Sequence, residues 1–451
     1  MDESRWSATR ADLFMRWLAE RLATAFLAGA WEVEELRSRG AQVVVRRHRW
    51  LTRLVQRIHA KGDGRGRLRR RWVVHWILED PSFLRACEYG DLEVDARIWD
   101  GRASMQPARG APATWQVPPI ATSGKLAEWL GIRVAELEWF AASGLARRTV
   151  SAGSLAHYRY QPINKRHGEI RLLEIPKSRL RELQRQILHR LLDFIPPHEA
   201  AHGFRAGRTI CTFAAPHVGQ PVVIRLDLRN FFPAIRRRRI EAIFLTAGYA
   251  EPVAVFLAGL CTHRVGYDVL AALDIPLIER CRLERLYGEP HLPQGAPTSP
   301  ALSNLVAYRL DCRLAALAAS AGASYTRYAD DLAFSGGREL SRSARRFQVQ
   351  VAAIALEEGF EVHGRKSRIM RAGTRQRLVG LTVNRHLNPP RQQFDRLKAT
   401  LHNCVTHGPM GQNRGDHGDF RAHLAGLVAY HEMINPARGA RLRALFDLIK
   451  W

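Results

Sequence analysis

The stretch from Ser324 to Ser335 constrains the fold of this chain more than any other. Two runs of residues with high β-propensity flank an adjacent pair of carboxylates, Asp330 and Asp331. A run, a tight acidic corner and a second run are typical of a β-hairpin, and Asp tolerates the positive φ that such a turn needs. The sequence therefore predicts an antiparallel hairpin with two carboxylates at its tip.

Two carboxylates on one tight turn face the same point in space. Their mutual repulsion disfavours two negative charges there unless a cation lies between them. Mg²⁺ is the natural candidate, because it prefers a few carboxylates together with substrate phosphates. The alternative is that Asp330 and Asp331 form an ordinary solvated turn, which is the usual role of such a dipeptide.

The chain is strongly basic, with 69 Lys and Arg residues against 43 Asp and Glu residues and a formal net charge of +26. This balance favours a polyanionic partner. No apolar run approaches the length of a membrane span, and no secretory signal opens the sequence. We therefore expect a cytoplasmic protein that binds nucleic acid and no membrane.

The cysteines lack the spacing of metal ligands or of a disulfide framework, which predicts reduced and mostly buried thiols. The six are Cys87, Cys211, Cys261, Cys281, Cys312 and Cys404.

A chain of 451 residues is too long for one ordinary core, so we expect several domains. Residues 1–99 are predicted to form a basic helical extension, and the segment 100–122, rich in Gly, Ala and Pro, is predicted to be a linker. Between Arg37 and Arg71, thirteen Lys and Arg residues and one acidic residue interleave with apolar residues. This pattern indicates a folded element that lays its basic side along RNA, with a merely solvated face as the alternative.

Residues 124–140 read as two short helices broken at Gly131. The pair superficially suits a helix-turn-helix DNA reader, but such pairs occur in many packing units, and we favour the structural role. Residues 156–178 alternate like two paired strands, with Lys165, Arg166 and Arg171 beside them. These cations could hold a triphosphate or guard an edge strand.

Three further stretches carry possible chemistry. In the loop 202–208, glycines bracket an aromatic residue and two arginines, so the backbone can approach a ligand closely. The β-branched run 222–227 predicts a buried central strand that ends in Asp227, a carboxylate that is costly there without a cation. Around Gln294, three prolines and Gly295 constrain the loop 292–300.

The Asp227 strand, Phe232, the 292–300 loop and the Tyr328 to Asp331 corner follow one another in this order, and they resemble the ordered motifs of reverse transcriptases. The resemblance covers roughly residues 155–435. Within that superfamily, the chain looks most like the bacterial retron reverse transcriptases, of the longer myxobacterial kind. The helical pair, the 202–208 loop and the segment leading into Leu378-Val379-Gly380 fit that group.

Two stretches depart from the retron pattern. The family's NAxxH motif corresponds to Phe213-Ala214-Ala215-Pro216-His217 here, and its VTG triplet corresponds to Leu378-Val379-Gly380. The polar Asn and Thr of these motifs are absent. The departures leave the polymerase residues untouched and bear on how the cognate RNA is recognised.

The resemblance implies an α+β fold of the right-hand polymerase type. A helical pair and fingers would occupy residues 123–220, and a palm with an antiparallel sheet would occupy 221–385. A helical insertion, 240–291, would interrupt the palm, and a helical thumb would follow over 386–451.

The resemblance also implies a two-metal site. Asp227 and Asp330 would ligate both Mg²⁺ ions, with the Leu228 carbonyl as a further ligand and Asp331 contributing charge nearby. Phe232 would exclude the 2′-OH of a ribonucleotide, with an ordinary core Phe as the alternative. The remaining implied residues bind nucleotide or RNA. Gln294, Gly295, Lys366, Arg171 and Arg208 are the nucleotide-binding candidates, and Tyr328, His217, Leu378, Val379 and Gly380 are the candidates for primer, template and RNA recognition.

By resemblance, the protein copies part of a structured non-coding RNA into cDNA from dNTPs, starts from an RNA 2′-OH, and acts against phage with a separate effector or toxin protein. One alternative is another bacterial reverse transcriptase, of the group II intron or abortive-infection type. Another is an RNA-binding scaffold that restrains a toxin. The intact set of three carboxylates favours an active enzyme.

Overall fold

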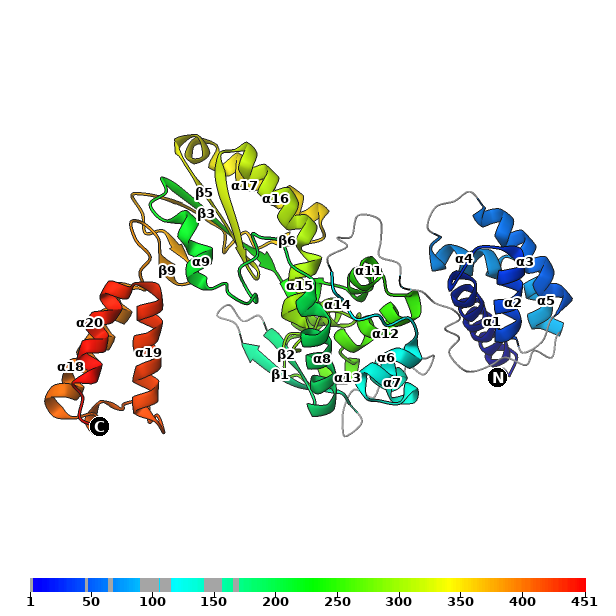
Figure 1. Cartoon of the computed structure of the whole chain (residues 1–451), viewed down its shortest axis with the longest axis horizontal. Helices are drawn as coiled ribbons and strands as arrows, with labels where there is room; N and C mark the ends of the chain where they lie inside the picture. The colour runs from blue at the N-terminus through cyan, green and yellow to red at the C-terminus, as the bar shows by residue number, and fades with distance from the viewer. Residues whose placement is uncertain are drawn as a thin grey trace. The chain divides into compact units, whose positions relative to one another are not determined.

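The computed structural model describes residues 3–44, 48–63, 68–89, 105, 115–141, 156–164 and 170–451, with the side chains of residues 3–14 and Tyr89 left out (Figure 1). The chain divides into two compact units. Unit 1 comprises Met1–Ile195 and Ile235–Ser299, and unit 2 comprises Pro196–Ala234 and Pro300–Trp451. Lys165, Arg166 and most of the predicted linker lie outside the described residues.

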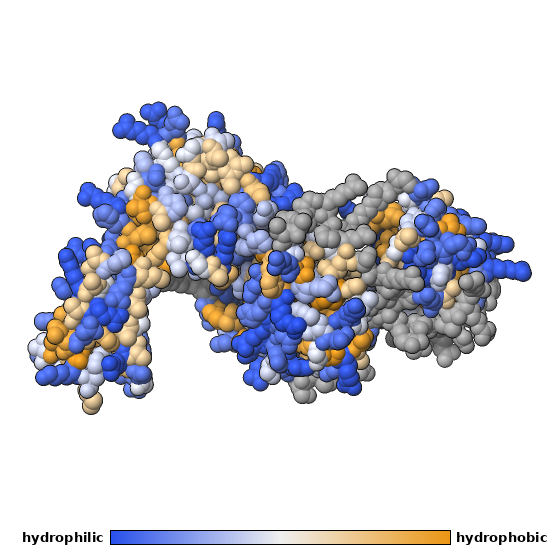
Figure 2. Space-filling model, in the orientation of Figure 1, coloured by the Kyte–Doolittle hydropathy of each residue, from blue (hydrophilic) through white to orange (hydrophobic). Residues whose placement is uncertain are grey.

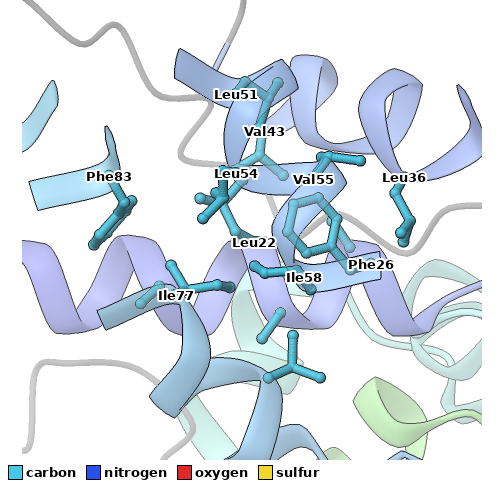
Figure 3. Close-up of a cluster of buried hydrophobic side chains, with 14 of the residues drawn as sticks. Leu22, Phe26, Leu36, Val43, Leu51, Leu54, Val55, Ile58, Ile77 and Phe83 are labelled. Carbon is cyan, nitrogen blue, oxygen red and sulfur yellow. The ribbon is translucent and has the colours of Figure 1, made fainter. Parts of the chain in front are cut away.

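Five helices open unit 1 and share their own hydrophobic core, which contains Leu22, Phe26, Leu54, Ile58 and Ile77 (Figure 3). The helices are α1 (Glu3–Leu27), α2 (Val33–Val43), α3 (Arg49–Gly62), α4 (Arg70–Leu78) and α5 (Pro81–Tyr89). The apolar residues that interleave with the basic run of the sequence are the ones that enter this core, so the run belongs to a folded element as predicted.

The predicted helical pair is confirmed as α6 (Ser123–Leu130) and α7 (Val134–Ala141). Gly131 ends α6 with a φ of +67°, the left-handed conformation that favours glycine at a helix C-terminus. Both helices pack against α12 (Glu251–Cys261), where a Cβ on Gly259 would collide with the Ala141 carbonyl. The pair therefore serves packing within unit 1.

The predicted hairpin over 156–178 is also confirmed, as β1 (Tyr158–Asn164) paired antiparallel with β2 (Ile170–Pro176). Helices make up the rest of unit 1. They are α8 (Ser178–Arg190), the 3-10 helix η1 (Leu192–Phe194), α11 (Arg237–Thr246), α12, α13 (Tyr267–Ala271) and α14 (Leu277–Tyr287).

Unit 2 is built on an antiparallel sheet with the order β4-β5-β3-β6, in which β7 also pairs with β3. The strands are β3 (Val222–Arg229), β4 (Ala323–Tyr328), β5 (Asp331–Gly336), β6 (Glu361–Val362) and β7 (Arg368–Arg371). β5 lines one edge of β3, while β7 and β6 share the other edge and leave the loop 363–367 between them.

Helices cover both faces of this sheet. Paired residues of an antiparallel sheet point to the same face, so Asp227, Asp331 and Ala333 share one face, while Phe334 and Arg327 lie on the other. Against the second face pack α16 (Tyr308–Ser320) and α17 (Arg338–Glu357). The first face meets α9 (Ile210–Ala214), the 3-10 helix η2 (Ala215–His217) and the hairpin of β8 (Arg377–Leu378) and β9 (Leu381–Thr382).

Short helices and a terminal bundle complete unit 2. α10 (Phe231–Ala234) follows β3, and α15 (Ser299–Val306) precedes α16. The helices expected over 386–451 are present as α18 (Arg391–His407), the 3-10 helix η3 (Met410–Gln412), α19 (Phe420–Ile434) and α20 (Pro436–Asp447). Leu401, Val428 and Leu442 are fully buried in the core of this bundle.

Hydrophilic side chains dominate the visible surface of the N-terminal helices (Figure 2). Across the described part of the chain, no helix combines the length and the apolar character that crossing a bilayer requires. All six cysteines are free thiols, as their spacing predicts. The expectation that most of them are buried is wrong, because only Cys261 and Cys404 are buried and Cys312 is exposed.

Candidate active site

The fold brings the three predicted carboxylates together in unit 2. Asp227 and Asp331 are register partners on β3 and β5, so both side chains lie on the same face of the sheet. The amide of Leu228 donates a hydrogen bond of 2.8 Å to the carbonyl of Asp330, which fixes the hairpin tip against the end of β3. Residues far apart in the chain therefore form one acidic cluster at the end of the paired strands β3 and β5.

The hairpin tip is a two-residue turn of Ala329 and Asp330 between the register partners Tyr328 and Asp331. The expectation that an Asp takes the positive φ of this turn is wrong, because Ala329 takes it, with a φ of +55°. A Cβ in this region costs roughly 1–2 kcal/mol. The surrounding structure therefore has to hold the turn in place.

Two contacts hold the turn. A Cβ on Gly203 would lie 2.6 Å from the Ala329 nitrogen, so only glycine lets the 202–208 loop pass against this backbone. From the other face of the sheet, Arg327 Nη1 donates to the Ala329 carbonyl at 3.2 Å and to Asn304 Oδ1 at 2.9 Å. Asn304 in turn donates to the Gly203 carbonyl at 2.9 Å, which closes the network.

Arg327 is itself fixed by a fully buried ion pair. Its Nε and Nη2 donate to the two carboxylate oxygens of Asp311 on α16 at 2.7 and 2.6 Å, and neither side chain is exposed to solvent. Tyr325 also donates to Asp311 Oδ1, at 2.8 Å. Arg327 carries no sequence signal of this role, because an arginine in an alternating strand is typical of an exposed face.

Negative charge accumulates at the tip. Burial raises the pKa of Asp331 to about 6, and the neighbouring Asp330 and Asp227 act in the same direction. Arg225 opposes this shift through an ion pair, with its Nε 2.7 Å from Asp331 Oδ1. Burial therefore outweighs the Arg225 ion pair in setting the protonation of Asp331, and the two neighbouring carboxylates add to its effect.

Asp227 meets a different cation, Lys366. The Lys366 ammonium lies 2.9 Å from Asp227 Oδ1 and 3.2 Å from Oδ2. Lys366 belongs to the loop 363–367, which fills the gap between β6 and β7, and the His363 amide donates to the Asp227 carbonyl at 2.7 Å. Lys366, which was predicted to neutralise a triphosphate, therefore forms an ion pair with Asp227.

The donor set fits a divalent cation by its chemistry. The cluster offers carboxylate oxygens, which are the ligands that Mg²⁺ prefers. The Lys366 ammonium already occupies a position beside Asp227 that a metal cation could take. In the conformation of the structure, no three His, Cys, Asp or Glu side chains among the described residues converge as a ready metal site. Metal binding would require Asp227 to exchange its contact with Lys366 for the ion.

Four aromatic residues of unit 2, Phe231, Phe232, Phe204 and Tyr328, form a chain of ring contacts that includes the residue before the Ala329-Asp330 turn. Phe232 on α10 is half-buried, and its ring centroid lies 6.0 Å from that of Phe204 and 5.6 Å from that of Phe231. Phe204 lies 6.5 Å from Tyr328, has a φ of +60°, and is 47% exposed. Sequence reasoning noted the loop that contains Phe204 but assigned the ring no role. The pattern of glycines around one aromatic residue was the available signal.

Gln294 and Gly295 lie in unit 1 with Arg171. The Glu174 amide of β2 donates to the Gln294 carbonyl at 2.9 Å, so the loop 292–300 continues the edge of the β1–β2 hairpin. Gly295 has a φ of +134°, and a Cβ there would lie 2.7 Å from the Glu174 carbonyl. Arg171 is half-buried on β2, three residues before Glu174.

Arg208 lies in unit 2, on the loop that also carries Phe204. Its Nη2 is 2.8 Å from Glu199 Oε2, and Arg205 contacts the other oxygen of the same carboxylate at 2.8 Å. Glu199 is 73% exposed, so this pair is weak, and Arg208 can exchange Glu199 for another anion.

His217 is fully buried between two hydroxyl groups. Thr326 Oγ1 gives its proton to the Phe213 carbonyl, so His217 Nε2 must donate to Thr326 Oγ1, and Nδ1 must accept from Ser335 Oγ; both distances are 2.7 Å. Burial lowers the pKa of His217 to about 4, with a further contribution from His202. The neutral imidazole therefore links η2 to the strands β4 and β5.

The two stretches that depart from the retron pattern meet in one core. Phe213 and Ala214 pack with Leu378, and Val379 lies at the margin of the same cluster. Val379 and Gly380 form the turn of the β8–β9 hairpin with φ angles of +41° and +88°. A positive φ at β-branched Val379 is rare and strained. The replacements therefore alter one connected part of the protein.

Comparison with known proteins agrees with this geometry. A family model described as reverse transcriptase (RNA-dependent DNA polymerase) matches residues 163–395. The retron Mx65 reverse transcriptase of Myxococcus xanthus is 40% identical over 338 residues, which cover 75% of this chain and 74% of that protein. The retron Mx162 reverse transcriptase of the same organism is 37% identical over 328 residues, or 70% of this chain and 64% of that protein. The retron Ec86 reverse transcriptase of Escherichia coli is 28% identical over 249 residues, which cover 54% of this chain and 69% of that protein.

Proposed function

This chain belongs to the retron group of reverse transcriptases, which are RNA-directed DNA polymerases, and from that premise we propose that it copies part of a structured non-coding RNA into DNA by two-metal phosphoryl transfer. The single observation that carries the proposal is the pairing of Asp227 with Asp331, beside Asp330, on the face of an antiparallel sheet. Within the right-hand layout, this sheet is the palm, the helices α18 to α20 are the thumb, and the β1–β2 hairpin belongs to the fingers.

Asp227 and Asp330 are the proposed ligands of two Mg²⁺ ions, with the Leu228 carbonyl, and Asp331 adds charge held in place by Arg225. When bound, the two ions supply activation of the primer hydroxyl and stabilisation of the leaving pyrophosphate. The strained Ala329 turn, fixed by Arg327, orients Asp330. Lys366, once released from Asp227, is within reach of the same region and can neutralise triphosphate charge.

Phe232 is the proposed selector of the sugar. Phe204 and Phe231 flank its ring, so it cannot turn away from an incoming ribose at low cost. A fixed ring beside the sugar rejects a 2′-OH by steric overlap and so favours dNTPs. The other proposed nucleotide-binding residues are Gln294, Gly295 and Arg171 in unit 1 and Arg208 in unit 2, and Tyr328 is proposed to contact the primer or template.

The finer retron chemistry is also part of the proposal. Synthesis would start from a 2′-OH of the RNA and give a branched RNA-linked DNA, and the product would act in defence against phage with a separate effector. His217, whose ring contacts Phe213, and the segment Leu378 to Gly380, of which Leu378 and Val379 pack in the Phe213 core, would support recognition of the RNA. We place the reaction in the cytoplasm, where the RNA and the dNTPs are made.

The test uses the full chain with whatever RNA copurifies. Wild type and the Asp330→Asn variant are each given labelled dNTPs and Mg²⁺. The proposal requires labelled DNA from the wild type and none from the variant, and it requires the product to shrink on both RNase and debranching treatment. Labelled product that resists debranching would favour another priming mode. Equal labelling by both proteins would reject the assigned site, and a scaffold role would require no labelling at all.

A further inference from the structure

Helix α3 carries a row of cations on its solvent side. Arg49, Arg53, Arg57 and Lys61 follow one another at every fourth residue, and all four are exposed. Residues four apart are neighbours on a helix surface and are separated by about 6 Å along its axis. The opposite side of α3 enters the N-terminal core through Leu51, Leu54, Val55 and Ile58, each at most 1% exposed. We call the four cations the α3 row.

Three of the four cations in the α3 row have no counter-charge among the residues that the structure describes. α3 contains no acidic residue, and among the described residues no carboxylate lies within ion-pair distance of Arg49, Arg53 or Lys61. Arg57 is the exception, because its Nε and Nη2 contact the Asp80 carboxylate at 2.6 and 2.8 Å. On the neighbouring helix α2, by contrast, Arg37 is paired with Glu34.

This arrangement costs stability in the free protein. Like charges four residues apart on a helix destabilise it by about 0.2–0.5 kcal/mol per pair. The α3 row contains three such pairs, and within the described ranges only Arg57 has a carboxylate partner, Asp80, to offset the repulsion. A polyanion bound along the row would remove this repulsion and release its own counterions.

The geometry points to the phosphates of RNA as the partner, and we propose that the α3 row binds the sugar-phosphate backbone of the RNA that the enzyme copies. A row of cations suits a strand of phosphates better than a single anion. A membrane surface fits poorly, because an interfacial helix needs exposed apolar residues beside its cations, and those of α3 are buried. The choice of RNA as the partner rests on the proposed function. The inference assigns a role to the N-terminal helices, which lie outside the residues matched by the family model.

The test compares two charge-matched variants of the full chain. Arg49→Gln, Arg53→Gln and Lys61→Gln together remove the uncompensated part of the α3 row. The control removes the same charge from arginines already paired with carboxylates, by Arg16→Gln, Arg37→Gln and Arg133→Gln. Binding of a fluorescent RNA duplex of 20 base pairs is measured from 0.05 to 0.3 M salt, and circular dichroism checks that each variant is folded.

The row variant should bind the duplex on the order of 10- to 100-fold more weakly at 0.15 M salt, and the slope of log K against log salt should flatten by about 2–3. The control should stay within about threefold of wild type. An unchanged slope in the row variant, or an equal loss in both variants, would overturn the inference. Tighter binding to anionic lipid vesicles than to RNA would overturn it as well.

A polymerase assay separates this inference from the proposed function. On saturating poly(rA) with an oligo(dT) primer, the row variant should incorporate dTTP at the wild-type rate, because α3 carries none of the proposed catalytic residues. Asp330→Asn should incorporate none while binding RNA normally. If the row variant binds RNA weakly but the Asp330→Asn enzyme is active, the proposed catalytic site is rejected and the inferred role of α3 in RNA binding is still supported.

Discussion

Arg327 Nη1 donates a hydrogen bond to the carbonyl of Ala329, the residue whose positive φ shapes the turn that presents Asp330. The same guanidinium makes a bidentate ion pair with Asp311, and both side chains are fully buried. A charge pair in the interior of unit 2 is thereby connected to the backbone of the acidic cluster. Arg327 acts as a positioning residue, because its effect passes through the turn.

Asp311→Asn should destabilise the protein by about 3–5 kcal/mol, because it leaves the buried Arg327 charge without a counter-charge. Thermal or urea unfolding measures this loss. Arg327→Met with Asp311→Leu removes both charges, and we expect it to recover most of the stability. The double variant should nevertheless lose at least about tenfold in kcat, because the Ala329 carbonyl and Asn304 lose their donor. A stable double variant with wild-type kcat would contradict the positioning role.

Lys366→Gln should make the acidic cluster bind divalent cations more tightly. The Lys366 ammonium contacts Asp227 and is half exposed, so the pair contributes about 0.2–1 kcal/mol, and its loss should improve affinity by up to about fivefold. Titration with Mn²⁺, followed by electron paramagnetic resonance, reports binding without turnover. Lys366→Arg retains the positive charge and serves as the control. Equal Mn²⁺ affinity in wild type and Lys366→Gln would show that Lys366 does not compete with the metal.

Phe232→Ala should relax the choice between deoxyribonucleotides and ribonucleotides. Removing the ring that Phe204 and Phe231 hold in place opens space for a 2′-OH, so rNTP use relative to dNTP use should rise by about 10- to 100-fold. The ratio of kcat/KM for dTTP to kcat/KM for UTP on one template measures this preference for deoxyribonucleotides. Phe204→Leu should change this ratio less, since that ring only supports Phe232. An unaltered ratio in Phe232→Ala would favour the alternative of an ordinary core residue.

Local patterns were enough to predict the strands, whereas the approach of Asp227 to the Asp330-Asp331 corner was implied by the resemblance to reverse transcriptases. The run 222–227 and the Asp330-Asp331 corner each carry their own β-propensity signals, and both strands formed as expected. Arg327 could not be found in this way, because its role depends on Asp311, which approaches it only after α16 packs on the sheet. The same limit applies to Phe204, whose contact with Phe232 depends on the path of a loop.

The turn itself shows a second limit. Propensity assigned the positive φ to an Asp, but in the structure Ala329 adopts it. Gly203 and Arg327 hold the Ala329 backbone from two sides, and these tertiary contacts outweigh a local preference of about 1–2 kcal/mol. Sequence alone could not predict this, because neither contact is local.

The buried imidazole of His217 predicts a pH dependence of stability with a definite sign. Burial lowers the pKa of His217 to about 4 in the folded protein, against about 6.5 for an unfolded chain. Between these values the unfolded state binds a proton that the folded state does not, so the free energy of unfolding falls as the pH drops from about 6.5 to about 4. The loss from this one group is at most about 3 kcal/mol.

His217→Gln isolates this contribution, because glutamine stays neutral and can still bond to Ser335 and Thr326. The free energy of unfolding is measured by urea titration for both proteins from pH 4 to pH 7.5. Other groups that titrate in this range, including Asp331 with its opposite sign, are common to both proteins and cancel in the difference. The stability advantage of wild type over the variant should be greatest above pH 6.5 and should shrink by about 2–3 kcal/mol toward pH 4. A difference that stays constant with pH would show that His217 accepts a proton in the folded protein as readily as in the unfolded chain.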